Sequence, residues 1–368
     1  MTTRLVTGYP RLLARRIATE VLADPGARVV MLVRTRFMEE ARRWVLSLGA
    51  DAERVEVLEG EVTAIDLGLG GREYLDLARR IDVVHHAAYS TSLEVGAKAI
   101  TALNIQGTRE VIELARAGLE QGSAPRVVAY SSVLALGGAE GLLREEDLDL
   151  GQRLRSPAEE TMHDAERLLR QAMEALPVTV VRASMIVGDS QTGEIDLFDG
   201  PYLFIVLMLS SPVDLRLPLP AGGDLPLHVV PVDHVARAGV ALGGMREAIG
   251  RTVHVVDPSP PTTRHAFERI AQVAGRGVPR GMVPVNLTRA LLNTPGLERL
   301  TRSPRAFVDR LATRARYSDA GARALLSPRG VECPPFEAYV GPLVAYTQAR
   351  LEARRARAVE VDVDDPLA

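Results

Sequence analysis

Few side chains in this sequence belong to the types that carry covalent or metal chemistry. Lys98 is the only lysine, so a mechanism that needs an amine depends on that residue. Cys333 is the only cysteine, which excludes an intramolecular disulfide and a metal site built from several cysteines. A lone cysteine is typical of a reducing compartment, and we expect a cytoplasmic protein.

Three side chains able to transfer a proton stand close together in the sequence. His85 and His86 end an apolar run. Because successive side chains of a strand point to opposite faces, we expect one histidine to be packed and the other to be free to face a cleft. Tyr89 follows them and is the more attractive candidate acid. For all three residues, packing is the commoner role.

The elements that would position these groups follow a regular pattern. Short apolar runs rich in β-branched residues alternate with longer amphipathic stretches. The expected strands are residues 4–7, 28–34, 55–58, 81–85, 126–130 and 178–183, and the expected helices are 12–22, 102–118 and 157–176. This alternation predicts an α/β fold, a doubly wound parallel Rossmann sheet with helices on both faces.

The pattern changes after residue 189, and we expect three regions. Residues 1–258 form the Rossmann domain, with substrate-side insertions at about 189–228. Residues 259–356 form a smaller, mostly helical region that covers a substrate or caps the cleft, and 357–368 form a loose acidic tail. Asp189, Asp196 and Asp199 lie in the insertion, where they suit turns and caps as well as catalysis.

Composition excludes two classes of function. The net charge is −3 with a pI near 6.2, so no basic field favours nucleic acid. The longest apolar run, residues 202–209, is far shorter than the roughly 20 residues that span a bilayer. The first residues lead directly into a strand pattern, so we expect no signal peptide.

Short motifs in a fixed order carry a family resemblance. One group resembles the extended short-chain dehydrogenase/reductases: Thr7-Gly8, Val83-Val84-His85-His86-Ala87-Ala88, Asn104-Ile105-Gln106-Gly107-Thr108, and Tyr130-Ser131-Ser132 followed by Gly137. A second group resembles the branch of fatty acyl-CoA reductases and thioester reductase domains, the NAD-binding, male-sterility type: Asp66-Leu67-Gly68-Leu69, Gly188-Asp189-Ser190, Thr192-Gly193-Glu194-Ile195, Asp199-Gly200-Pro201-Tyr202 and Val230-Pro231-Val232-Asp233. The resemblance covers residues 1–260 well and implies a domain that binds NADP or NAD and reduces a carbonyl or an acyl thioester.

The phosphate-binding turn departs from the family pattern. The family has three glycines, each separated by two residues, and here these positions hold Gly8, Arg11 and Ala14. The first glycine permits the tight turn, the second lets the backbone approach the pyrophosphate, and the third allows close helix packing. The Arg11 guanidinium either pairs with a phosphate or fills a disused site, and both interpretations stay open.

The resemblance also implies contacts to the rest of the cofactor. Arg34, at the end of the second strand, favours the 2′-phosphate of NADP over NAD, although a solvated arginine explains it equally well. Glu61 stands where the family commonly has an aspartate near the adenine. Ala87, Ala88 and Ser184 complete the positions that the resemblance places at the cofactor.

The catalytic pair of the family is missing. A tyrosine and, four residues later, a lysine share one face of a helix, and the serine at position 132 adds a third hydrogen bond. Here Ser132 is kept, but Ala158 takes the tyrosine position and Met162 takes the lysine position. The resemblance therefore implies ordinary chemistry that these side chains cannot perform.

Three hypotheses follow. The first is a degenerate member that binds a nucleotide or ligand, or serves a partner protein, with weak or no activity. The second is an NADPH-dependent reductase of an acyl thioester, aldehyde or ketone with a reassigned acid such as Tyr89. The third is a non-redox enzyme on an acyl or polyketide-like ligand. The resemblance adds an acyl-carrier protein or lipid-like ligand as partner, and a homodimer through helices 102–118 and 157–176.

Overall fold

The computed structural model describes residues 1–91, 96–198, 201–210, 219–220, 223–278, 282–283 and 313–364. The chain divides into two compact units, each built from several segments. The first unit contains Met1–Ile186, Val232–Pro258 and Ala315–Cys333, and the second contains Val187–Pro231, Ser259–Arg314 and Pro334–Ala368. The two units are therefore interleaved along the sequence.

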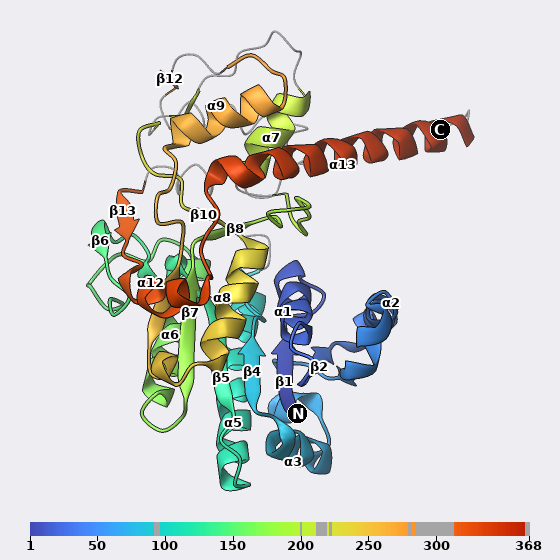
Figure 1. Cartoon of the computed structure of the whole chain (residues 1–368), viewed down its shortest axis with the longest axis vertical. Coiled ribbons are helices and arrows are strands. Elements are labelled where there is room, and N and C mark those ends of the chain that lie inside the picture. The colour runs from blue at the N-terminus through green and yellow to red at the C-terminus, as the bar shows by residue number, and fades with distance from the viewer. Residues whose placement is uncertain are drawn as a thin grey trace. The chain divides into compact units, whose positions relative to one another are not determined.

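A seven-stranded parallel sheet forms the centre of the first unit (Figure 1). Its spatial order is β11 (Thr252–Val255), β7 (Val178–Ala183), β5 (Arg126–Ser132), β4 (Val83–His86), β1 (Thr2–Thr7), β2 (Ala27–Val33) and β3 (Val55–Glu59). The strand order reverses between β1 and β4, which confirms the predicted doubly wound fold. In such sheets, ligands bind at the carboxyl ends of the strands beside this reversal.

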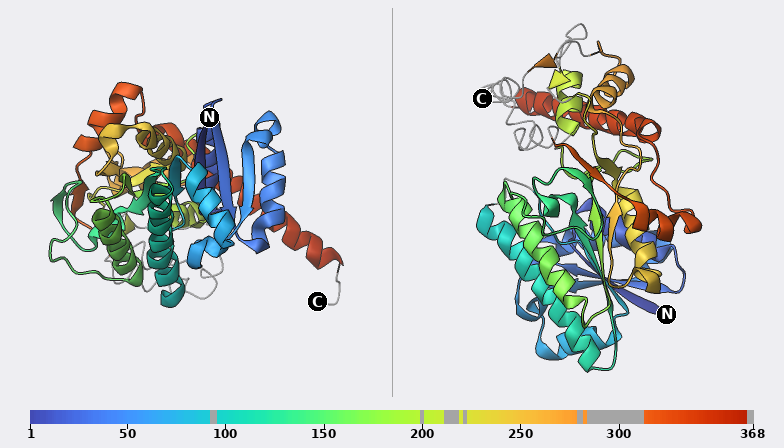
Figure 2. Two further views of the ribbon diagram at one scale, coloured as in Figure 1. Left: turned by 90° about the horizontal axis from the view of Figure 1, so that it is seen from below. Right: turned by 90° about the vertical axis from the view of Figure 1, so that its left-hand side faces the viewer.

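Helices cover both faces of the sheet (Figure 2). On one face, α3 (Gly71–Arg80), α5 (Gly107–Glu120) and α6 (Pro157–Ala172) share an apolar core with the strands. On the other face, α1 (Leu12–Leu22) packs against α8 (Val232–Gly244). The first unit also contains α2 (Met38–Leu46), α4 (Ala97–Thr101), a π-helical turn (Ala102–Gln106) and α12 (Ala320–Leu326).

The local sequence explains most of these elements. The apolar run of β2 is buried on both faces, as expected for an inner parallel strand. The helix predicted to reach residue 176 ends at Ala172, and a turn over residues 173–175 leads to Pro177. The helix predicted at 102–118 is preceded by α4 and by the π-helical turn, so the helical path begins at Ala97.

The returning segment Ala315–Cys333 is tied to the first unit by a small strand pair. β13 (Ala315–Tyr317) lies parallel to β6 (Gly141–Leu143). Leu136, Ala139, Leu143 and Ala315 form one apolar cluster, against which Tyr317 packs. This segment therefore braces the chain that follows β5.

The second unit is mainly helical in its described part. It contains α7 (Pro201–Ser210), α9 (Thr263–Val273), α13 (Phe336–Asp364) and the short strands β9 (Leu219–Pro220), β10 (Val229–Pro231) and β12 (Met282–Val283), while β8 (Met185–Val187) lies at its boundary. The rings of Phe204 and Phe267 stack with centroids 3.9 Å apart. α13 continues to Asp364 and so includes residues 357–364, where the sequence predicted a loose tail.

Candidate cofactor site and the helix beside it

Gly8 lies where the ends of β1 and β4 meet. Its φ angle is +104°, and a Cβ atom added there would stand 2.8 Å from the backbone carbonyl carbon and oxygen of Ala87. A side chain would therefore be both strained and in collision with β4. Ala87 and Ala88 are buried, so small residues line this close approach. The turn at the strand reversal thus has the narrow shape that a dinucleotide site requires.

Arg11 precedes the first residue of α1. Its backbone N–H donates to the carbonyl oxygen of Gly8 at 3.0 Å, and its own carbonyl accepts from Arg15 at 3.2 Å. The Arg11 side chain is half-buried and gives α1 no cap. Ala14 is completely buried, so the third family glycine is replaced without opening the packing of α1. Arg11 therefore shapes the turn through its backbone.

Arg34 and Glu61, predicted separately, form one ion pair. Arg34 Nε lies 2.6 Å from Glu61 Oε2, and Arg34 Nη2 donates to Glu61 Oε1 at 3.0 Å. The two side chains are 35% and 36% exposed, so the pair sits at the surface of the carboxyl edge. A phosphate that approaches Arg34 meets a guanidinium already engaged by a carboxylate.

Ser184 follows β7 and is 2% exposed. Its backbone N–H donates to Val255 at 3.3 Å, whereas its Oγ has no hydrogen-bond partner among the described residues. A buried hydroxyl without a partner is uncommon in a folded protein. This hydroxyl and the narrow turn at Gly8 are the two features that fit a bound dinucleotide.

α6 begins with a strong start signal. Ser156 Oγ accepts the backbone N–H of Glu159, and Pro157 is the first helical residue. Glu159 in turn accepts the backbone N–H of Arg155 at 2.7 Å and pairs with its guanidinium at 2.8 Å. The register of α6 is thus set by local capping.

The inner face of α6 is apolar at both catalytic positions of the family. Ala158 and Met162 are each 1% exposed. Met162 joins Ala135 and Leu148 in an apolar cluster, and Tyr89 and Leu134 pack against it. The lysine position is therefore filled by packed hydrocarbon and sulfur. Lys98, on α4, is exposed.

Asn104, in the π-helical turn, holds Met162 from the other side. Its amide makes two backbone bonds to Ser90, accepting at 2.8 Å and donating at 2.9 Å. The same Nδ2 lies 3.0 Å from Thr161 Oγ1 and 3.6 Å from Met162 Sδ. The sequence names Asn104 only within the motif Asn104–Thr108, because its burial and its contact with Met162 cannot be read from residue spacing.

Ser132 ends β5 and is half-buried. Its Oγ accepts the backbone N–H of Leu134 at 3.3 Å and so caps the 3-10 turn Val133–Leu136. That turn carries Ala135, a member of the Met162 cluster. Ser132 therefore lies beside α6, and among the described residues its Oγ is seen only as an acceptor.

Tyr89 lies next to the Met162 cluster, as its candidacy requires. Its hydroxyl is 3.1 Å from Thr108 Oγ1, and its ring meets that of His86 edge-on at 4.5 Å. Burial raises the pKa of the Tyr89 phenol, and the hydrogen bond with Thr108 opposes this only in part. A raised pKa makes the Tyr89 phenol a weaker proton donor than an ordinary tyrosine.

The histidines considered as acids are structural. His85 and His86 are both completely buried, which corrects the expectation that one of them faces a cleft. His85 Nδ1 lies 3.1 Å from Tyr130 OH, and His86 Nδ1 lies 2.9 Å from Thr7 Oγ1. Burial lowers the pKa of each to about 3, so both are neutral at physiological pH.

A buried ion pair behind α6 was missed by sequence reasoning. Glu166 of α6 and Arg182 of β7 are both completely buried and bonded to each other, with Arg182 Nε to Glu166 Oε2 at 3.1 Å. Ser131, the neighbour of Ser132, donates to the same Glu166 oxygen at 3.1 Å. An arginine inside an otherwise apolar strand was the available signal, because a buried charge must be paired.

His254 extends this network to the returning segment. Its Nε2 accepts from Arg182 at 2.8 Å, and its Nδ1 donates to the carbonyl of Ser318 at 2.8 Å. Burial, and then Arg182, lower the pKa of His254 to about 3. Glu145 accepts the backbone N–H groups of His254, Gly321 and Ala322. The network joins β7, β11, α6 and α12.

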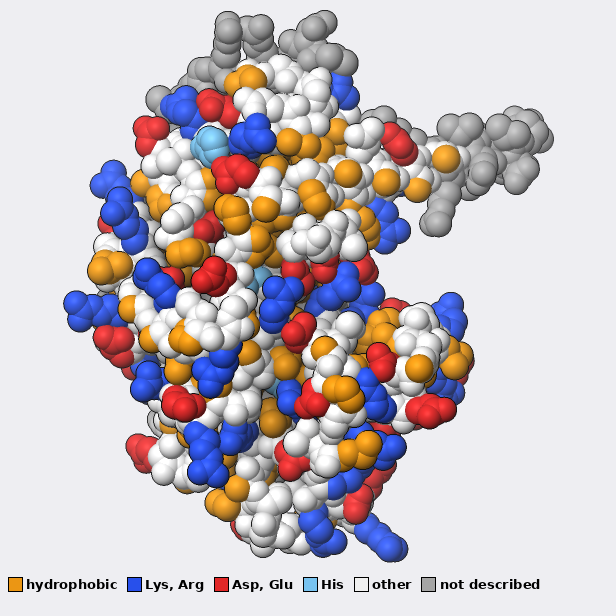
Figure 3. All heavy atoms as spheres, viewed as in Figure 1, with side chains coloured by type: hydrophobic (Ala, Val, Ile, Leu, Met, Phe, Trp, Pro, Cys, Tyr) orange, Lys and Arg blue, Asp and Glu red, His pale blue; other side chains and the backbone are white. Residues whose placement is uncertain are grey.

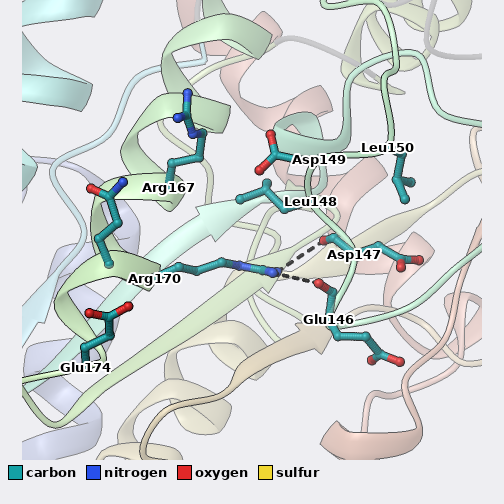
Figure 4. A pocket seen from close by; sticks show the side chains of 9 residues that line it. Glu146, Asp147, Leu148, Asp149, Leu150, Arg167, Arg170 and Glu174 are labelled. Atoms are coloured by element: carbon teal, nitrogen blue, oxygen red, sulfur yellow. Dashed lines mark hydrogen bonds between the residues drawn. The ribbon is translucent and has the colours of Figure 1, made fainter.

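The outer side of α6 borders a polar pocket of about 570 Å³ (Figure 4). Arg170 points across it and donates to the carbonyl oxygens of Glu146 at 2.6 Å and Asp147 at 3.2 Å. His163 contacts Ala135 O and Asp149, both at 2.9 Å. These contacts hold the preceding loop against the helix, so His163 is a packing residue whose ring bonds the backbone of Ala135 and the carboxylate of Asp149.

In the second unit, Asp189 forms a turn. Its Oδ1 accepts from the backbone N–H groups of Gln191 and Thr192 at 3.0 and 2.9 Å. The hydroxyl of Tyr202 accepts the N–H of Gly188 at 2.8 Å. Asp199 lies outside the described residues.

The surface carries mixed charge. Basic and acidic side chains are interspersed over the face in Figure 3. Among the residues that the structure describes, no helix is long and apolar enough to cross a bilayer.

Comparisons with known proteins agree with this geometry. A family model of an NAD-binding domain, described as "Male sterility protein", matches residues 6–239. Glycine betaine reductase ATRR of Emericella nidulans is 31% identical over 284 residues, 72% of this chain, and the chain spans 22% of that protein's length. The terminal R domain of the myxalamid PKS-NRPS pathway superposes with a TM-score of 0.79 at 23% identity, covering 95% of this chain and 91% of that one. A thiolation-reductase di-domain from an archaeal non-ribosomal peptide synthetase gives a TM-score of 0.74 at 16% identity, covering 94% and 75%.

Proposed function

Because the chain belongs to the male sterility family of NAD-binding domains within the extended short-chain dehydrogenase/reductases, we propose that it binds NADP in preference to NAD. The close approach of Gly8 to Ala87 supports a pyrophosphate at this turn, where the amino end of α1 favours an anion. Arg34 offers a guanidinium at the end of β2, where a 2′-phosphate would lie. When bound, the dinucleotide would supply the hydride that such reductases transfer.

We infer that the protein has weak or no reductase activity and acts by binding a nucleotide or ligand, or as a partner of another protein. The burial of Ala158 and Met162 in an apolar face carries this inference. Neither side chain donates a proton or carries a charge. Loss of a positioned acid lowers a rate by about 10²–10⁴-fold, and here the contact to the nicotinamide ribose is lost as well.

Two measurements on the purified protein test the proposal together. Calorimetry with NADPH should show binding. Absorbance at 340 nm should show no NADPH oxidation above the protein-free rate with octanoyl-CoA or with an aldehyde. Binding without turnover supports a degenerate member of the family, and turnover near that of ordinary reductases refutes it. If NADPH does not bind, the proposed dinucleotide cofactor is wrong.

Tyr89 carries the second candidate function, an active NADPH-dependent reductase. Its side chain packs against the cluster that contains Met162. In that case any measured turnover is lost in Tyr89→Phe, whereas NADPH affinity is retained. If Tyr89→Phe leaves turnover unchanged, the phenol is structural, as its contacts with Thr108 and His86 favour.

The same proposal includes a ligand and a setting. One relative is named a reductase, and one similar structure is a thiolation-reductase di-domain. We therefore propose that the ligand of this chain is an acyl or lipid-like group, either free or on an acyl-carrier protein. We further propose a cytoplasmic protein that forms a homodimer through α5 and α6. A monomeric elution volume in size-exclusion chromatography would argue against the dimer.

A further inference from the structure

The ion pair between Arg34 and Glu61 leads to an inference that rests on the proposed binding of NADP. Arg34 is the one basic side chain that directly follows β2, and Glu61 lies just beyond β3, the neighbouring strand. The register pairs Val33 with Glu59, so the two loops leave the sheet side by side. Their side chains therefore meet at the edge where a 2′-phosphate would have to bind.

The Glu61 carboxylate binds one edge of the Arg34 guanidinium. Its two oxygens bind Nε and Nη2 of Arg34 at 2.6 and 3.0 Å, the two-point geometry with which arginine also binds a phosphate. A phosphate that uses the same two donors must displace this carboxylate. Whichever donors it uses, it must also lie close to a second negative charge.

The backbone around Glu61 holds the carboxylate in place. The Glu61 N–H donates to the carbonyl of Leu67 at 2.8 Å, and its carbonyl accepts from Ala64 at 2.9 Å. Thr63 N donates to Glu61 Oε1 at 3.3 Å. The loop then passes through Asp66, Leu67 and Gly68, with positive φ angles of 53°, 59° and 73°. Leu67 is completely buried, so this unusual loop is anchored and Glu61 cannot withdraw freely.

The other charged groups at this edge are engaged differently. Glu59 is exposed and accepts from Thr35 Oγ1 at 2.7 Å. Arg36 is exposed and lies over the ring of Phe37 at 4.6 Å. Glu61 is thus the carboxylate that directly competes for Arg34.

We propose that Glu61 limits the preference of this protein for NADP by occupying the arginine that would bind the 2′-phosphate. Removing the Glu61 charge frees Arg34 and removes the repulsion between two anions. At a partly exposed site this should strengthen binding of a 2′-phosphate about tenfold.

Calorimetry with four nucleotides tests this inference. NADPH and 2′,5′-ADP carry the 2′-phosphate, whereas NADH and 5′-AMP lack it. For Glu61→Gln we expect the ratio of NADPH to NADH affinity and the ratio of 2′,5′-ADP to 5′-AMP affinity each to rise about tenfold. Arg34→Gln should reduce the difference between NADPH and NADH, and adding Glu61→Gln to it should have little further effect.

Glu59→Gln is the matched control, because it removes an exposed carboxylate from the same edge without touching Arg34. It should leave the NADPH to NADH ratio unchanged. If Glu61→Gln weakens NADPH binding, or shifts all four nucleotides alike, Glu61 does not compete for Arg34 and the inference fails while the proposed cofactor site stands. If none of the four binds to the wild type or to any variant, the proposed function fails with it.

Discussion

Two parts of the first unit, the carboxyl edge of the sheet and the inner face of α6, differ in which features of the family they share. The carboxyl edge, made by Gly8, Arg34, Glu61, Ala87 and Ala88, keeps the backbone geometry of a dinucleotide site. The α6 face, made by Ala158 and Met162, keeps its helix but carries apolar side chains at the positions where the family has a tyrosine and a lysine. The edge depends on a turn that only glycine can make, whereas α6 folds with apolar side chains at those two positions.

The contrast persists because α6 is held by other residues. The Ser156 cap and the Arg155–Glu159 pair fix its start, and the Glu166–Arg182 pair fixes its middle. None of these contacts involves the positions of the missing tyrosine and lysine. The fold of α6 therefore does not depend on a tyrosine and a lysine at these positions.

Breaking the support behind α6 should have the largest effect. Arg182→Met leaves Glu166 completely buried with its main partner removed, and we expect the free energy of unfolding to fall by about 3–5 kcal/mol. Urea unfolding followed by circular dichroism measures this. Arg116→Met, which removes an exposed pair with Glu113, is the control and should change stability by less than about 1 kcal/mol. Equal effects of the two substitutions would show that the buried pair does not hold α6.

Placing a charge on the α6 face tests whether it is packed core or open cleft. Met162→Lys puts an ammonium into the cluster of Ala135 and Leu148, and we expect a loss of about 2–4 kcal/mol in unfolding free energy. Met162→Leu keeps the volume and should lose less than about 1.5 kcal/mol. A lysine tolerated as well as leucine would mean that this position opens to solvent. Ala158→Tyr with Met162→Lys would then be the variant in which to look for restored reduction.

Adding one methyl group at the carboxyl edge should separate binding from stability. Gly8→Ala forces a Cβ to within 2.8 Å of the Ala87 backbone, at a φ of +104°, and should lower stability by about 1–3 kcal/mol. We also expect it to abolish NADPH binding in calorimetry. Gly122→Ala is the control: its φ is +82° but no atom lies within 4 Å of the added Cβ, so it measures the stability cost of the backbone conformation alone. If both variants bind NADPH like the wild type, the close approach at Gly8 is not needed by the cofactor.

The smallest expected effect is a pH dependence that comes from the network behind α6. The folded-state pKa of His254, about 3, lies below its ordinary value of 6.5, so the neutral ring stabilises the fold above pH 6.5. This contribution is lost as the pH falls from 6.5 toward 3, by about 1.4 kcal/mol per pH unit. Urea unfolding at pH 7, 6 and 5 should show a shallower decline in His254→Gln than in the wild type. Parallel declines would show that His254 does not titrate on unfolding.

The strands, most helices and the two apolar replacements on α6 could be predicted from the sequence, because each depends on residues that are close together along the chain. The helix Leu12–Leu22 has the predicted bounds, and Ala158 and Met162 share one helix face, as a separation of four residues requires. The sequence did not predict the network Glu166–Arg182–His254, whose members are 16 and 72 residues apart in sequence and meet only through strand order.

The sequence by itself determined the parallel sheet, the turn at Gly8 and the absence of the tyrosine and lysine, because periodicity and residue identity are local properties. Only the tertiary structure decided that Arg34 and Glu61 neutralise each other, that both His85 and His86 are buried, and that Tyr89 lies against Met162. These outcomes depend on which strands are neighbours and on how deeply each side chain is covered. Charge pairing and burial then set whether a group is free to bind or to react, and neither can be read from spacing along the chain.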